Sequence, residues 1–77
     1  MEKQIMYSLT LNGTPLFVSA GKETILERRK IVVRERIEFI KGTNKYKLLS
    51  AKINQITYFD GDEYIIDNYR ITEVEVI

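Results

Sequence analysis

The chain has 77 residues, of which 44% are hydrophobic and 30% are charged, and its formal net charge is +1. This balance is that of a globular chain, and the length allows one domain, so we expect residues 1–77 to form a single compact unit. The sequence contains no His and no Cys. That composition excludes disulfides, a thiolate or imidazole catalyst and a zinc–thiolate site, so we expect a non-enzymatic protein without a cofactor.

The first predicted element is a hairpin. Residues 5–11 alternate between apolar and polar side chains and lead into Asn12-Gly13, a pair that tolerates the positive φ angles of a tight turn. Residues 16–19 follow as the returning strand. Pro15 stands at the start of that strand, where a missing N–H donor does least harm.

The segment 24–41 fits two interpretations. As a strand over 31–40, it places Ile31, Val33, Ile37 and Phe39 on one face, opposite charged residues. Four β-branched residues lie within 31–37, and such residues lose side-chain entropy in a helix. We favour the strand interpretation on these grounds.

The helical interpretation of the same segment stays open. Thr24 and Glu27 have the spacing of a capping box, and Gly42 is suited to end a helix after Lys41. Most apolar residues between 25 and 40 fall within one arc of a helical wheel, into which Arg29 and Arg36 intrude.

The remaining residues continue the β pattern. We expect a second hairpin over 37–49 with its turn at 41–45, and a strand to residue 59 with a bulge at Asn54-Gln55. A turn at 60–63 precedes strands at 64–66 and 69–77, which are separated by a break at Asp67-Asn68. The sequence therefore predicts an all-β meander of five or six strands curling into a barrel-like sheet. The alternative is an α+β fold with one helix at 25–41 packed on an antiparallel sheet.

Charge is distributed unevenly along the chain. Residues 22–52 carry ten Lys or Arg and four acids, for a net charge of +6, whereas residues 53–77 carry one Arg and six acids, for a net charge of −5. A basic face over 28–52 is typical of a surface that binds nucleic acid or an acidic protein. The candidate partner-binding residues are Arg28, Arg29, Lys30, Arg34, Arg36, Lys41, Lys45, Tyr46, Lys47 and Lys52.

The same residues also fit structural roles within the chain. The basic and acidic parts of the chain are suited to pair as neighbouring strands, which would neutralise the basic face internally. Tyr46 lies between Lys45 and Lys47, the setting of a base-stacking platform, but tyrosines are equally common in half-buried packing and at protein interfaces. The acidic turn at 60–63 lacks the spacing of a calcium loop and is interpreted as a solvated turn, so we expect no metal.

These observations lead to three functional hypotheses. The first is a small binding protein that covers a surface of a larger macromolecule, with a protein as the expected partner and tyrosines as anchors. Ile, Lys, Asn and Tyr contribute 27 of the 77 residues, a composition common in short phage and mobile-element proteins, so inhibitors and assembly factors of that type are included. The second is a nucleic-acid-binding module that uses residues 28–52. The third is a homo-oligomeric structural subunit that pairs through its last strand, which ends at Ile77.

The sequence also predicts a location. No apolar run approaches the roughly 20 residues of a membrane span, and the first residues do not resemble a signal peptide. We therefore expect no membrane partner and a cytoplasmic protein, inside the host cell if a phage encodes it.

Overall fold

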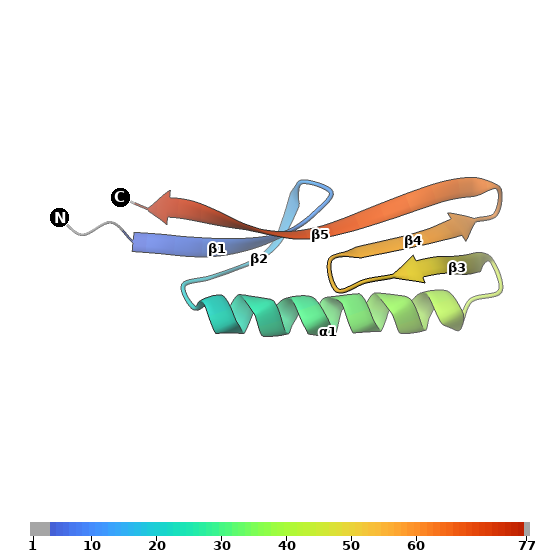
Figure 1. Cartoon of the computed structure of the whole chain (residues 1–77), viewed down its shortest axis with the longest axis horizontal. Helices are drawn as coiled ribbons and strands as arrows, with labels where there is room; N and C mark the ends of the chain where they lie inside the picture. The colour runs from blue at the N-terminus through green and yellow to red at the C-terminus, as the bar shows by residue number, and fades with distance from the viewer. Residues whose placement is uncertain (1–3, 77) are drawn as a thin grey trace.

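The fold is an open antiparallel sheet with one helix on one of its faces (Figure 1). The structure is a computed structural model that describes residues 4–76. Its elements are, in chain order, β1 (Gln4–Leu11), β2 (Thr14–Ser19), α1 (Lys22–Lys41), β3 (Tyr46–Ala51), β4 (Gln55–Asp60) and β5 (Glu63–Val76). The strand order is β2-β1-β5-β4-β3, so β2 and β3 form the two edges and the expected barrel-like closure is wrong.

Strand β5 is shared by two hairpins. Its residues 63–68 pair with β4, and its residues 69–76 pair with β1 on the opposite side. Figure 1 shows β1 beside one half of β5 and β4 beside the other half. The predicted break at Asp67-Asn68 is wrong, because β5 continues through these residues and only changes its neighbour there.

This offset arrangement makes the molecule long and narrow. Its Cα atoms extend over 53 × 19 × 15 Å, and the radius of gyration is 14.7 Å. A compact domain of this length has a radius of gyration of roughly 11.5 Å. The chain therefore buries less of its surface than its length allows.

The two tight turns have the conformations that their sequences predict. Asn12 and Gly13 connect β1 to β2 with φ angles of 51° and 89°, both positive, as a two-residue hairpin turn of the primed type requires. Gly61, with a φ of 63°, lies in the two-residue turn between β4 and β5. The hairpin at Asn12-Gly13 and the turn at 60–63 are confirmed.

The predicted strand over 31–40 is wrong, because Lys22–Lys41 form the helix α1 and the α+β alternative fits better. Ile25, Val33 and Ile40 recur at helical spacing and are buried. A helix of 20 residues is about 30 Å long, so it reaches across both halves of the elongated sheet and contacts β1, β2, β3 and β5. This burial outweighs the entropy that the β-branched residues lose in a helix.

Smaller differences concern the ends of the elements. The helix ends before Gly42, as the helical interpretation predicts. It starts after Gly21, which has no side chain that could cap the helix. The expected hairpin over 37–49 is wrong, since residues 42–45 link α1 to β3. The expected bulge at Asn54-Gln55 is also wrong, since residues 52–54 form the turn between β3 and β4.

The hydrophobic core lies between α1 and the sheet face that it covers. Its buried members are Leu9, Ile25, Val33, Ile40, Ile56, Tyr58 and Tyr69. The register places the exposed apolar side chains Val18, Tyr64, Ile66 and Val74 on the other sheet face. Within residues 4–76, the structure contains no helix of the length and hydrophobicity that a membrane crossing needs.

Two isoleucines of α1 provide a test of this packing. Ile25 is fully buried, whereas Ile31 is 39% exposed on the same helix. We expect Ile25→Ala to lower the free energy of unfolding by about 2–5 kcal/mol, because it leaves a cavity in the core. Ile31→Ala removes the same atoms from the surface and should change it by less than about 0.5 kcal/mol. Urea titrations followed by circular dichroism measure both values, and equal losses would contradict the position of the helix.

Candidate cationic groove

The ten predicted partner-binding residues separate into three groups. Lys30, Arg34, Lys41 and Lys52 line one groove on the surface. Arg36, Lys45 and Tyr46 take part in contacts between the C-terminal half of α1 and the sheet. Arg28, Arg29 and Lys47 lie apart from both groups.

The groove lies between α1 and the turn that connects β3 to β4. Lys30, Arg34 and Lys41 stand on one stripe of the helix, because their spacings of four and seven residues are close to whole helical turns. Lys52 faces them from the turn. As a strand, the same segment would have placed Lys41 on the face opposite Lys30 and Arg34. The helix is therefore what gathers these charges.

The groove has both basic and apolar lining residues. Its volume is about 480 Å³, and Val33, Ile37, Ala51 and Ile53 supply its apolar lining. Ile53 is 46% exposed, so a large apolar surface is open to solvent beside the cations. The sequence analysis did not associate either apolar residue with the cations, because it placed Ile37 on the apolar face of a strand and did not single out Ile53.

The charge of the groove is not balanced from within the chain. Glu38 is the single acid among the lining residues, against four cations. Among the residues that the structure describes, no carboxylate lies within 4.0 Å of any of these four cationic groups. The hypothesis that the acidic part of the chain neutralises the basic face therefore does not describe this group. The groove has a net charge of +3 and a field that attracts anions.

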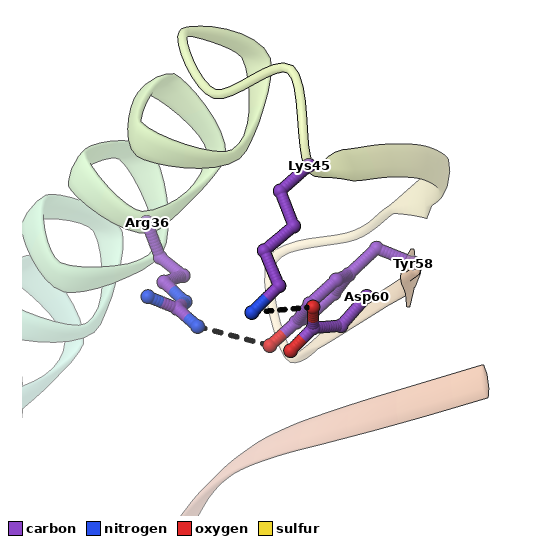
Figure 2. Close-up of polar contacts among 4 residues, drawn as sticks. All are labelled: Arg36, Lys45, Tyr58 and Asp60. Atoms are coloured by element: carbon purple, nitrogen blue, oxygen red, sulfur yellow. Dashed lines mark hydrogen bonds and ion pairs between the residues drawn. The ribbon is translucent and has the colours of Figure 1, made fainter. Parts of the chain in front are cut away.

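Arg36 has an internal role. Its Nη2 donates a hydrogen bond of 2.9 Å to the hydroxyl oxygen of Tyr58 (Figure 2). Its guanidinium lies 5.1 to 5.8 Å from the ring centroids of Phe39, Tyr46 and Tyr58, within the range of cation–π attraction. Burial alone would lower the pKa of Arg36, but the hydrogen bond to Tyr58 and the nearby Asp67 raise it above its ordinary value. Arg36 thus joins α1 to β4 as a cation.

Lys45 and Tyr46 are engaged in the same region. The Lys45 ammonium group lies 3.2 Å from a carboxylate oxygen of Asp60, which raises the pKa of Lys45 (Figure 2). Lys45 is 66% exposed, so this ion pair adds little stability. The ring of Tyr46 is half-buried and lies edge-on to Tyr58 at 5.4 Å. Tyr46 therefore packs against the core rather than offering an open ring for stacking.

The last three candidates have separate surroundings. The guanidinium of Arg28 lies 4.5 Å from the ring centroid of Phe17. Lys47 pairs with Phe59 on the sheet face away from the helix. Arg29 lines a second cavity, of about 390 Å³, and its Nε is buried without a hydrogen-bond partner among the described residues. The basic residues therefore do not form one continuous surface.

Two buried polar side chains lie near the centre of the molecule. Asp67 is buried, and its carboxylate accepts a hydrogen bond of 3.3 Å from the side-chain amide of Asn12. Tyr69 is also buried, and its burial together with the neighbouring Asp67 raises the pKa of the Tyr69 hydroxyl above its ordinary value. The sequence pattern did not indicate Asp67, because the segment 67–68 was interpreted as a break, and it placed Tyr69 only at the start of the last strand.

Comparisons with known proteins found no relative of this chain. No protein-family model matches the sequence, no curated protein matches it, and no solved structure matches the fold. Within residues 4–76, no three His, Cys, Asp or Glu side chains are grouped so that they could hold a metal ion. The function is therefore inferred from the groove and from the surfaces around it.

The raised pKa of Tyr69 predicts a pH dependence of stability. An unfolded Tyr ionises near pH 10, so above this pH the unfolded chain loses the Tyr69 proton before the folded protein does. The free energy of unfolding should then fall as pH rises, by up to about 1.4 kcal/mol per pH unit from this group. Tyr69→Phe removes that contribution. Chemical unfolding measured between about pH 9 and pH 11 should show a smaller loss of the free energy of unfolding for the variant than for the parent. Parallel plots of this free energy against pH would contradict the prediction.

Proposed function

We propose that the chain is a small, non-catalytic binding protein of the cytoplasm that covers an acidic segment of a partner protein with its cationic groove. The observation that carries this proposal is a groove lined by four cations and four apolar residues, with one acid among the described lining residues. A surface of this kind is suited to an acidic segment that also presents a large apolar side chain.

The basic and the apolar lining residues of the groove support different parts of binding. Lys30, Arg34 and Lys41 stand along the helix, where they can meet carboxylates spaced along a bound segment. The exposed side chain of Ile53 and the half-buried Ile37 supply the apolar contact that gives affinity. Charge then steers the approach and selects acidic partners, while apolar burial slows dissociation.

The mechanism we propose is steric and electrostatic. By occupying an acidic surface, the chain would prevent other cationic partners from binding there, which is the action of an inhibitor or an assembly factor. Its composition supports a role without chemistry at neutral pH, because the sequence contains no His and no Cys.

Nucleic acid is the alternative ligand for the same cations. Binding of single strands uses exposed aromatic rings beside basic residues. Among the described residues, no aromatic ring lines this groove, and Tyr46 packs edge-on against Tyr58 instead. This arrangement favours a protein segment, and it makes nucleic-acid binding an outcome that the following experiment distinguishes.

The proposal predicts selective binding of a short synthetic peptide in which Glu and Leu alternate. The probe is titrated into the isotope-labelled protein and followed by NMR. Amide shifts should concentrate on residues of the groove, which include Arg34, Lys41 and Lys52. The variant Arg34→Gln/Lys52→Gln should weaken binding by roughly tenfold or more, because it removes two of the four cations.

Matched variants and probes make the experiment decisive. Arg28→Gln/Lys47→Gln carries the same change of charge outside the groove and should bind the peptide as the parent does. A peptide with Gln in place of Glu should bind weakly. Equal weakening by both double variants, or stronger and steeply salt-dependent binding of a single-stranded oligonucleotide, would contradict the proposal.

A further inference from the structure

Part of one edge of β5 has no neighbouring strand among residues 4–76. Pairing with β4 covers residues 63–68 of β5, and the Tyr69 N–H donates to the Asn54 carbonyl at 2.8 Å where β4 begins. Beyond Tyr69, β5 pairs with β1 on its other side, and no described strand lies on the side of β4. The segment 70–76 is therefore an edge, although it belongs to the central strand of the sheet.

The backbone of this edge points away from β1. The Asn12 N–H donates to the Asn68 carbonyl at 3.0 Å, so Asn68 faces β1, whereas Tyr69 faces β4. Backbone groups alternate in direction along a strand, so the N–H and C=O groups of Ile71 and Glu73 face the side of β4. These groups are in place to accept another strand.

A cationic cavity flanks the same edge. Lys22, Leu26 and Arg29 of α1 line it together with Ile71 and Glu73 of β5. The buried Nε of Arg29 has no hydrogen-bond partner there, and no carboxylate among residues 4–76 lies within 4.0 Å of Lys22 or Arg29. A strand added at this edge would place its helix-facing side chains beside these two cations. The complementary strand is one with acidic and apolar side chains on that face.

We propose that the occupant of this edge is β5 of a second copy, so that the chain forms a symmetric dimer through antiparallel β5–β5 pairing. The chain's own strand carries the matching chemistry, because Ile71 and Glu73 share the face of β5 that is turned toward α1. A two-fold axis perpendicular to the sheet leaves both helices on the same side. Glu73 of each copy then lies beside Lys22 and Arg29 of the other, and one sheet continues through both chains.

The length of the open edge sets the register. It runs from 70 to 76, so a two-fold axis at Glu73 gives the longest pairing that leaves the contact between Asn54 and Tyr69 in place. Glu73 would meet its symmetry mate as a hydrogen-bonded pair. The two carboxylates are accompanied by four cations, Lys22 and Arg29 from each copy, which offset their mutual repulsion.

The shape of the molecule supports self-association. An elongated chain of 77 residues without Cys has a small core and no disulfide to stabilise it. Joining two sheets along an edge satisfies backbone groups that otherwise face solvent. The dimer interface is separate from the cationic groove, so this inference does not depend on the proposed function.

The first test is the oligomeric state. Sedimentation equilibrium of the wild-type protein should give twice the chain mass of 9.1 kDa. Glu73→Pro removes an N–H that is directed away from β1, so it should preserve the fold while raising the dimer dissociation constant by roughly tenfold or more. Circular dichroism checks the fold of the variant. A wild-type protein that stays monomeric at millimolar concentration would overturn the proposal.

A cross-linking experiment tests the register independently of the proline variant. The chain has no Cys, so a single substitution introduces one defined thiol. Opposed residues of a hydrogen-bonded antiparallel pair have Cα atoms about 5.5 Å apart, within the range of a disulfide or a short thiol cross-linker. Glu73→Cys should cross-link rapidly between copies. The control, Ile66→Cys, reports on packing through the exposed sheet face, and preferential cross-linking at that position would overturn the edge pairing.

A pair of arginine variants separates the two surfaces. Arg29→Gln removes a cation beside the β5 edge and should raise the dimer dissociation constant by roughly fivefold to tenfold, whereas Arg34→Gln should leave it unchanged. Arg34→Gln should weaken binding of the acidic peptide, whereas Arg29→Gln should leave this binding unchanged. A dimer that is equally sensitive to both variants would overturn the assigned interface without affecting the peptide result.

Discussion

The structure depends on the hydrogen bonds that let one strand serve two hairpins. At the middle of β5, the Asn12 N–H donates to the Asn68 carbonyl, and the Asn68 N–H donates to the Asn12 side-chain oxygen at 2.9 Å. One residue further, the Tyr69 N–H donates to the Asn54 carbonyl. The turn of the first hairpin and the start of β4 are thus fixed to adjacent residues on opposite sides of β5. Because these hydrogen bonds hold both hairpins to the middle of β5, this junction determines the offset of the two halves of the sheet.

The offset determines which surfaces remain open. An elongated sheet needs a cover of matching length, and the 20 residues of α1 provide it with buried residues near both ends and in the middle. The cations of the helix therefore lie beside two different features of the sheet. Near its start, Lys22 and Arg29 flank the open edge of β5, and further along, Lys30, Arg34 and Lys41 border the turn between β3 and β4. The two cationic surfaces are consequences of one strand arrangement.

The parts of the fold that the sequence predicted correctly are those fixed by local chemistry. The turn at Asn12-Gly13 needs two positive φ angles, and the turn at 60–63 needs Gly61, so both follow from residue type. The helix did not follow from residue type in this way. Over 31–37, side-chain entropy favours a strand, whereas burial in the core favours a helix. A row of β-branched residues disfavours a helix locally, but only a helix brings Ile25, Val33 and Ile40 to the same core. Sequence analysis also identified the basic residues, but their grouping depends on helical phase and on strand register, which composition does not contain.

Arg36 shows why a list of basic residues is a poor description of a binding surface. Its intrusion into the apolar arc of α1 counted as a defect of the helical interpretation, yet three aromatic rings and the Tyr58 hydroxyl surround it in the fold. Its charge therefore serves the contact between helix and sheet, whereas Arg34, two residues earlier, is exposed and without a carboxylate partner among the described residues. A helix turns by about 200° over two residues, which separates an internal cation from an external one. The net charge of +1 does not reveal this division between internal and external cations, and the proposed binding of an acidic segment depends on it.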